Sequence, residues 1–270
     1  MLLAQGHAPR SVVAALIAAD AGCDQRQLHL LGALGPPAAH SGAACIDWCG
    51  QTSGAHYSVA GNMLAGPQAL TATDFRLAAE NGRQTANVIG VIENQAPTRH
   101  LRMQVSAKGG EIRADLTRGL AKVALVERHQ GSGGVQMGLV QGFGFNEPCG
   151  LASTVAHDSH QMIVIGTDDR DMALAANHLM QTGGGQVVVR RGEIIGEVNL
   201  PIAGLISNQP AELVARQAET VLAGFRACGC KLNNANMQMS LLALVVIPEL
   251  RISDKGLVDV RRFQVIDVLE

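Results

Sequence analysis

The first seventy residues alternate between short apolar runs and clusters of turn-forming residues. SVVAALIAADAG, from Ser11 to Gly22, predicts a short helix with a serine near its start and a glycine at its end. RQLHLLGALGPPAAHSG predicts two strands joined by a Gly-Pro-Pro turn, and HYSVAGNMLAG predicts a third strand before a Gly-Pro break. This small set of elements has little core of its own and is typical of a piece of a sheet.

From about Thr73 onward the pattern is richer and more regular. AKVALVERHQGSGGVQMGLVQGFGF predicts two strands around a Gly-Ser-Gly-Gly connection, and GLASTVAHDSHQMIVIGT predicts a second pair. QVVVRRGEIIGEV predicts a hairpin that turns at Arg191-Gly192.

Two helices interrupt these strands. TDDRDMALAANHLMQTGGG predicts a helix capped by Thr167, with Asp168 and Asp169 at the positive end of its dipole and Gly183 as its stop. SNQPAELVARQAETVLAGFRACGC predicts a helix that ends at Gly229, with an apolar face of Ala211, Val214, Ala218, Val221, Leu222 and Phe225. Strands and helices mix without the strict alternation of a barrel. We therefore expect an α+β domain with mixed sheets and packed helices, and no TIM barrel.

The composition limits the classes of protein that fit this pattern. The chain has 270 residues, 47% hydrophobic and 16% charged, with a net charge of −2, so it can bury one large core or two modest ones. It has no basic run, and Trp48 and Tyr57 are its only Trp and Tyr, so we expect no nucleic-acid partner. No apolar segment reaches the roughly 18 residues of a membrane span, and MLLAQGHAPR is too short and too polar for a signal peptide. We expect a cytoplasmic protein with no membrane partner.

The cysteines have irregular spacings and no accompanying histidine pattern. Without an export signal, they are expected to be reduced thiols rather than disulfides. A zinc site at Cys45 and Cys49 would need two further ligands, and none is suitably placed in the sequence.

The strongest candidate chemistry is a cluster of ionisable residues in two segments. Glu127 and His129 are two residues apart, so in an extended segment both side chains point to the same face. His157 and His160 are three apart, a spacing that converges on a turn or a helix, and Asp158 lies between them. If the two segments are neighbours, imidazole groups and a carboxylate meet around a polar pocket suited to proton transfer or metal ligation.

A structural interpretation of the same residues stays open. Asp158 and Ser159 are also suited to capping a turn, while the histidines satisfy buried backbone groups. No arrangement here matches a known metal-ligand spacing well.

Two stretches of the first seventy residues, LIAADAGCDQRQLHLL and HSGAACIDWCGQTSGAHYSVAGNMLAGP, resemble part of an uncharacterised family with the N-terminal-nucleophile hydrolase fold. The resemblance implies that residues 1–72 form a truncated αββα-type segment. That fold requires a nucleophile at the start of a preceding segment, but Met1 is followed by Leu2. We carry over no catalytic residue, and we expect Cys45, Asp47 and Trp48 to serve packing and turn formation.

The rest of the chain resembles a second family. VERHQGSG, GFGF, LASTVAHDSHQMIVIGTDDRDMALA, GGGQVVV, LPIAGLIS, CGCKLNN and VIPELRISDKGLVDV occur in the order and at the intervals of the carboxy-terminal domain of adenine deaminase. The likeness runs from about Asp74 to the end, so residues 73–270 are expected to form such a domain. The departures are local: Gln130 stands where the family tends to have a histidine, NNANMQMS replaces a more apolar stretch, and Val245 replaces a proline.

This second resemblance implies a reaction. Adenine deaminases hydrolyse the 6-amino group of adenine to give hypoxanthine and ammonia, using a metal-activated hydroxide on a TIM-like barrel, with Mn or Fe expected in the full-length family. The sequence has no His-x-His pair, and a barrel alone needs roughly 250 residues. We therefore expect no cofactor or metal in this chain and an amidohydrolase barrel as a partner. The catalytic candidates are His157, Asp158 and His160, supported by Glu127 and His129 and dependent on that partner.

Other functions stay open. The chain is alternatively a non-catalytic purine-binding or assembly module, a vestigial fusion product or, least in keeping with its first residues, a hydrolase of the N-terminal-nucleophile type. Two incomplete domains would expose sheet edges and apolar faces, so we also expect a homo-oligomer or, alternatively, a poorly behaved monomer.

Overall fold

The computed structural model describes residues 2–45, 50–61, 69–129 and 132–270. The chain divides into two compact units: Met1–Gly66 with Arg128–Ser132, and Pro67–Glu127 with Gly133–Glu270. Four residues that the sequence pattern singled out lie outside the described residues: Asp47, Trp48, Cys49 and Gln130.

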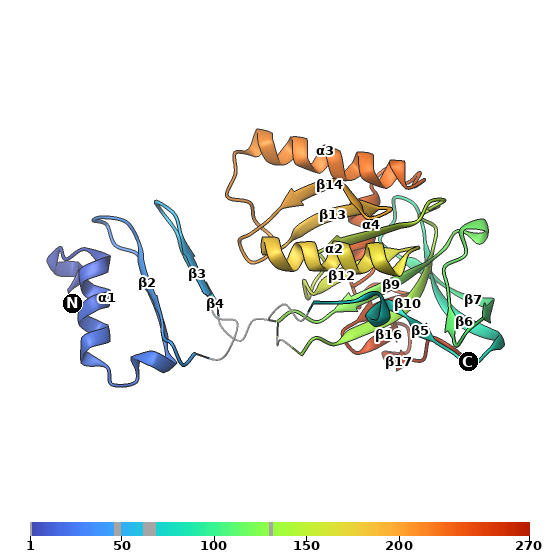
Figure 1. Ribbon diagram of the computed structural model, residues 1–270, viewed down its shortest axis with the longest axis horizontal. Coiled ribbons are helices and arrows are strands. Elements are labelled where there is room, and N and C mark those ends of the chain that lie inside the picture. Colours follow the sequence, from blue (N-terminus) through green and yellow to red (C-terminus); the bar gives the residue numbers. More distant parts are fainter. Residues whose placement is uncertain (1, 46–49, 62–68, 130–131) are drawn as a thin grey trace. The chain divides into compact units, whose positions relative to one another are not determined.

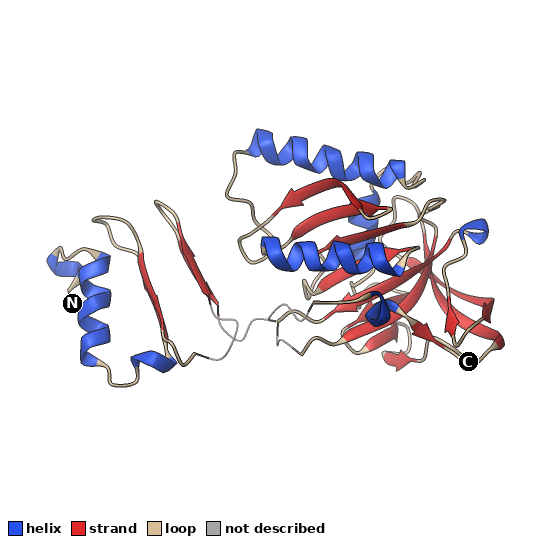
Figure 2. Cartoon of the chain, viewed as in Figure 1, coloured by secondary structure: helices blue, strands red, loops and turns tan. Residues whose placement is uncertain are grey.

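The first unit consists of a helix followed by two antiparallel strand pairs (Figure 2). Its elements are α1 (Pro9–Ala19), β1 (Gln27–Leu30), β2 (Ala38–Ser41), β3 (Gly50–Ser53) and β4 (Ser58–Gly61), with short 3-10 helices at Leu3–Gln5 and Cys23–Gln25. The predicted helix, the strand pair around the Gly-Pro-Pro turn and the third strand are confirmed, but the helix ends at Ala19 and not at Gly22. The helix begins at Pro9, whose fixed φ and missing N–H suit the first helical position. Strand β3 was not predicted because its sequence, GQTS, has no apolar residue.

The second unit is built on a mixed sheet of eight strands in the order β14-β13-β11-β12-β9-β10-β6-β7. Among these strands only β10 and β6 pair in parallel. The strands are β6 (Gly82–Val91), β7 (Thr98–Ala107), β9 (Leu120–Val126), β10 (Val135–Gln141), β11 (Cys149–Ser153), β12 (Met162–Gly166), β13 (Gly185–Arg190) and β14 (Glu193–Asn199). Smaller sheets pair β5 (Leu77–Ala78) with β8 (Glu111–Ile112) and join β15 (Leu250–Ser253), β16 (Gly256–Asp259) and β17 (Gln264–Ile266).

Helices cover both faces of the eight-stranded sheet (Figure 1). One core joins α2 (Asp169–Thr182) to Ala124 and Val126 of β9. The other joins α3 (Ala211–Ala227), α4 (Ala235–Leu241) and the β15–β17 sheet to Val123 and Leu125 of the same strand. Because successive side chains of a strand point to opposite faces, the two cores lie on opposite sides. This burial on both faces explains why β9 reads as a continuous apolar run with one lysine.

The predicted strand pairs and the hairpin are confirmed. β9 pairs with β10, β11 with β12 and β13 with β14, all antiparallel. Arg191 and Gly192 have φ of 54° and 83°, as a two-residue hairpin turn of type I′ requires. The buried carboxylate of Asp171, on α2, accepts hydrogen bonds of 2.7 Å from both of their N–H groups.

The helices agree with the pattern except at one cap. α2 ends at Gly183 as predicted, but its cap is Asp168, whose carboxylate accepts from the N–H groups of Arg170 and Asp171. Thr167 instead donates to the carbonyl of Glu147 and accepts from the N–H of Cys149. Its hydroxyl is thus used to tie β11 to the preceding loop. On α3 the predicted face is buried at Val221 and Phe225, whereas Ala211 is exposed at the first turn.

The α+β class is confirmed, and the described residues form no closed barrel. None of the helices in the described ranges is long and apolar enough to cross a membrane. The cysteines that the structure describes are all free thiols.

Candidate functional site

The candidate site is the turn between β11 and β12, where His157, Asp158 and His160 lie. The N–H of His160 donates to the carbonyl of Ala156 at 2.7 Å, which closes the turn. His160 has a φ of 51°, a left-handed conformation that is uncommon for residues other than glycine and is enriched at functional sites. The N–H of His157 donates to the carbonyl of Ser240, on α4, at 3.2 Å. The backbone of the turn is therefore fixed from inside and from a neighbouring helix.

The imidazole rings of His157 and His160 are in contact. Their centroids are 5.4 Å apart and their planes meet at 63°, an edge-to-face arrangement. Nδ1 of His157 lies 3.8 Å from Oδ1 of Asp158, and the side chains of these two residues are 34% and 78% exposed. The His157 ring thus lies beside an imidazole and a carboxylate at the surface. Two imidazoles beside a carboxylate are suited to passing a proton near neutral pH.

Glu127 lies next to this turn because β9 and β12 are neighbours. Val126 pairs with Met162, which places Glu127 beside Gln161. The Gln161 side chain donates to Oε1 of Glu127 at 3.5 Å, and both residues are buried. The two segments are therefore neighbours, as the hypothesis required. Gln161 was not predicted, although a glutamine directly before a buried strand is a usable signal.

Glu127 and His129 lie just beyond strand β9, which ends at Val126. The N–H of Glu127 donates to the carbonyl of Gly134, which continues the antiparallel register of β9 and β10 by one residue. His129 is exposed in a bend and falls in the Arg128–Ser132 segment of the first unit. We therefore define the candidate site as Glu127, His157, Asp158, His160 and Gln161, and a role for His129 stays a prediction.

The residues of the turn do not fit a metal ion. In the described ranges, no three His, Cys, Asp or Glu side chains are grouped so that they could hold one. A catalytic zinc or similar ion takes at least three protein ligands, and the turn is not part of such a set. No step is therefore assigned to a metal bound here.

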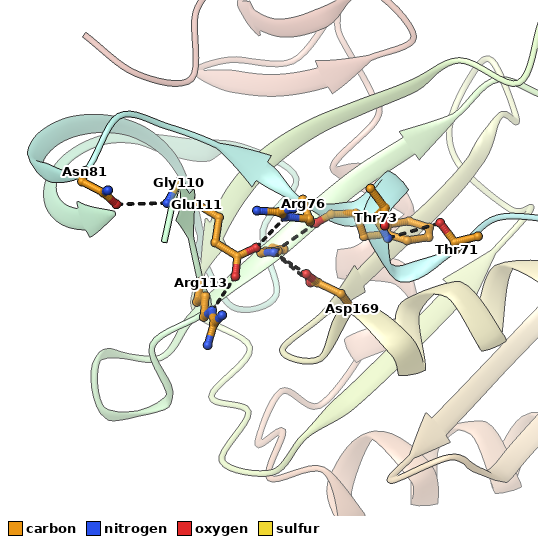
Figure 3. A network of polar contacts seen from close by, with 10 residues as sticks. Thr71, Thr73, Arg76, Asn81, Gly110, Glu111, Arg113 and Asp169 are labelled. Carbon is orange, nitrogen blue, oxygen red and sulfur yellow. Dashed lines mark hydrogen bonds and ion pairs between the residues drawn. The ribbon is translucent and has the colours of Figure 1, made fainter. Parts of the chain in front are cut away.

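A second polar cluster lies at the start of α2. Lys122 is buried, and its ammonium group contacts both carboxylate oxygens of Asp169 at 2.8 Å and the carbonyl of Phe75 at 3.0 Å. Figure 3 shows Arg76 and Arg113 reaching the carboxylate of Glu111 close by, at 3.0 and 2.6 Å. The sequence pattern did not find Lys122 because a single lysine in an apolar strand carries no motif.

The pKa values of the two carboxyl groups in this cluster are shifted in opposite directions. Burial raises the pKa of Asp169, against the lowering effect of Lys122. The hydrogen bond from Arg113 lowers the pKa of Glu111. The cluster borders a cavity of about 330 Å³. Because each acid is matched with a base, the cluster is primarily a structural network that attaches residues 71–76 to the sheet and to α2.

Comparison with known proteins gives two family matches. Residues 95–264 match the adenine deaminase C-terminal domain, and residues 1–92 match a family of unknown function, DUF1028. The chain is 55% identical to adenine deaminases of Ruegeria sp. (strain TM1040) over 203 residues and of Ruegeria pomeroyi over 205 residues. It is 45% identical over 202 residues to that of Moorella thermoacetica. These matches cover 74–75% of this chain and 33–34% of the relatives.

The chain therefore spans about a third of the length of the curated relatives that it matches. The match covers 74% of the 270 residues, or about 200. A continuous stretch of this length that ends by residue 270 begins no later than about residue 71. It then includes β6 as well as β7, in agreement with the single antiparallel hairpin that these strands form. With this similarity, and a family model that covers 95–264 of the 270 residues, the chain belongs to the adenine deaminase C-terminal domain family.

Proposed function

We propose that this chain supplies the carboxy-terminal domain of an adenine deaminase and takes part in the hydrolysis of adenine to hypoxanthine and ammonia. The observation that carries the proposal is the identity of about half of all residues with proteins named adenine deaminase over three quarters of the chain. Because the chain spans only a third of those relatives, the remaining parts of the enzyme are supplied by an amidohydrolase barrel. Adenine or a related purine is the substrate.

Within that enzyme, we assign His157, Asp158 and His160 to the edge of the purine site. The His157 side chain is one-third exposed, and the backbone bond to Ser240 fixes the main chain from which it extends. The carboxylate of Asp158 lies beside the imidazole and helps to orient it. Glu127 stabilises the end of the turn by accepting a hydrogen bond from the side chain of Gln161. His129 stays a prediction as a further supporting residue.

The metal of the reaction, Mn or Fe, is assigned to the barrel. The described residues of this chain offer no set of three ligands, and a hydrolytic metal needs such a set together with an open position for water. The role left to this domain is to close the site, orient the purine and move a proton at the imidazole nitrogens of the turn.

The test is an adenine-to-hypoxanthine assay on the purified chain with added Mn²⁺ or Fe²⁺, alone and with a barrel-bearing homologue. We expect activity only with the barrel, and we expect it to exceed that of the barrel alone. Turnover by the chain alone would contradict the assignment of the metal to the barrel. No effect of the chain on the barrel would contradict a role in the enzyme.

A second candidate function is purine binding without catalysis, which the lack of a ligand set in the described residues favours. Isothermal titration of the chain with adenine separates the two, because binding without any stimulation of the barrel indicates a binding module. A cytoplasmic location and self-association stay predictions. Light scattering after size-exclusion chromatography tests the second of these.

A further inference from the structure

The turn that carries His157 rests on the last turn of α4. The N–H of His157 donates to the carbonyl of Ser240, and Ala156, just before it, is buried in the same core as Met239 of α4. A helix leaves the carbonyl groups of its last turn without partners inside the helix. The carbonyl of Ser240 is one of these, so the backbone position of His157 depends on where α4 ends.

One buried side chain, Arg251 at the start of β15, holds this end of α4. Its Nη1 donates to the carbonyl of Leu241 at 2.7 Å, its Nε to the carbonyl of Ile247 at 2.7 Å and its Nη2 to the carbonyl of Ala96 at 2.5 Å. The guanidinium group has five N–H donors in a fixed plane. A single side chain thus fixes three backbone segments relative to one another: the end of α4, the loop before β15 and the connection between β6 and β7.

Burying a charged guanidinium group in a core position costs free energy, because the group loses its contact with water. Arg251 is 0% exposed, and within the described ranges its partners are carbonyl groups and no carboxylate. Burial lowers its pKa to about 10, so it still carries its charge at neutral pH. Apolar side chains of similar volume often replace buried ionic groups without loss of stability. A buried cation at this position therefore indicates a requirement for placement of the backbone.

We propose that Arg251 is a positioning residue that sets the place of the His157 to His160 turn through α4. The chain of contacts runs from the guanidinium group to the carbonyl of Leu241, along the helix to the carbonyl of Ser240, and from there to the N–H of His157. It joins the AHDSH and VIPELRISDKGLVDV stretches, which are far apart in the sequence. The meaning of this placement for catalysis rests on the proposed function, but the placement itself is a property of this chain.

The test compares Arg251→Lys with Lys122→Met in the full chain by NMR, well below the melting temperature of either variant. Arg251→Lys keeps a basic group but loses the planar set of guanidinium donors. Lys122→Met disturbs a buried basic residue on the opposite face of the sheet, where Lys122 contacts Asp169 and Phe75. In Arg251→Lys we expect the backbone amide of His157 to exchange its hydrogen about tenfold faster than in the unmodified chain, measured relative to the amide of His178 on α2. This factor corresponds to the loss of one hydrogen bond to a charged group. We also expect the imidazole ¹⁵N shifts of His157, assigned with His157→Gln, to change in Arg251→Lys only.

Unchanged exchange and ring shifts of His157 in Arg251→Lys would overturn the proposal, and so would equal changes in Lys122→Met. If Arg251→Lys does not fold, native-state hydrogen exchange of the unmodified chain decides. We expect the amides of His157 and Leu244 to share one denaturant dependence, because both donate to the last turn of α4. Independent opening of His157 would overturn the proposal. Neither measurement needs adenine or a barrel, so failure of the deaminase assay and failure of this inference are distinguishable.

Discussion

The ammonium group of Lys122 contacts both carboxylate oxygens of Asp169 at 2.8 Å, joining the centre of the sheet to the first residue of α2. The lysine side chain is 2% exposed and the aspartate side chain 24%. The pair therefore has one fully buried member, whose counter-ion is the other.

The two members of this pair are not equivalent to mutation. Asp169→Asn leaves a buried ammonium without its counter-ion, and we expect a loss of about 3 kcal/mol in the free energy of unfolding, the low end for broken buried pairs. Lys122→Met removes the buried charge itself and places a similar volume in the apolar core, so we expect a smaller loss. Urea denaturation of both variants measures the difference. A Lys122→Met variant that is the less stable of the two would contradict this account of the pair.

Glu111 gives the stability a dependence on acid pH. Because the hydrogen bond from Arg113 lowers its pKa below the usual 4.5, its contribution is complete above about pH 4.5 and is lost as the pH falls through the lowered value. Both arginine side chains are partly exposed, 46% for Arg76 and 77% for Arg113, so we expect Glu111→Gln to cost only about 1 kcal/mol at pH 7.

Measurement of the unfolding free energy of Glu111→Gln and the unmodified chain between pH 7 and pH 3 checks this prediction. The difference between the two proteins should shrink as the pH falls. Burial is the largest cause of the raised pKa of Asp169 and is common to both proteins, so the difference removes that part of the opposite contribution. A difference that stays constant down to pH 3 would show that the charge of Glu111 is not what stabilises the fold.

Local patterns predicted the elements of the second unit from β9 to α3, because these elements are bounded by residues with strong backbone preferences. Gly183 ends α2 and Arg191-Gly192 turns the hairpin, both with positive φ. The longest strands, β6 and β7, were not predicted. Polar residues such as Arg83, Gln84 and Arg102 interrupt their apolar pattern, and ten paired residues per strand hold them together instead.

The roles of the candidate-site residues stay predictions, but their surroundings show what spacing alone could not give. Sequence spacing located the turn of His157 and His160, but it could not show that β9 ends at Val126, before Glu127 and His129. It also could not show that Gln161 faces Glu127, since that contact follows from the register of β9 against β12. Contacts between distant segments, such as those of Arg251, depend on tertiary packing that no local pattern encodes.

The crossing of α2 over β11 depends on Gly150. A Cβ atom at this position would lie 2.2 Å from backbone atoms of Asp171 and Met172, far inside van der Waals contact. Since backbone cannot move aside as a side chain can, we expect Gly150→Ala to destabilise the second unit by about 3 kcal/mol, as for severe overpacking. The control is Gly50→Ala, where the described residues place no atom within 4 Å of the added Cβ and the effect should stay within about 0.5 kcal/mol. Thermal unfolding that is equal for the two variants would contradict the close packing of α2.

The role of the histidine pair is testable in a reconstituted deaminase. If His157 or His160 moves a proton in the reaction, replacement by alanine should lower kcat by about 10²-fold to 10⁴-fold with a smaller change in KM.

The matched control is His178→Ala: this histidine also contacts a carboxylate, Glu197 at 2.6 Å, but lies on α2. We expect the control to keep kcat within about twofold, because it lies outside the turn and surface changes of this kind are mild. Steady-state kinetics on the chain with its barrel partner measures all three variants. Unchanged kcat in both turn variants would remove the pair from the reaction, whereas a higher KM with unchanged kcat would assign it to purine binding.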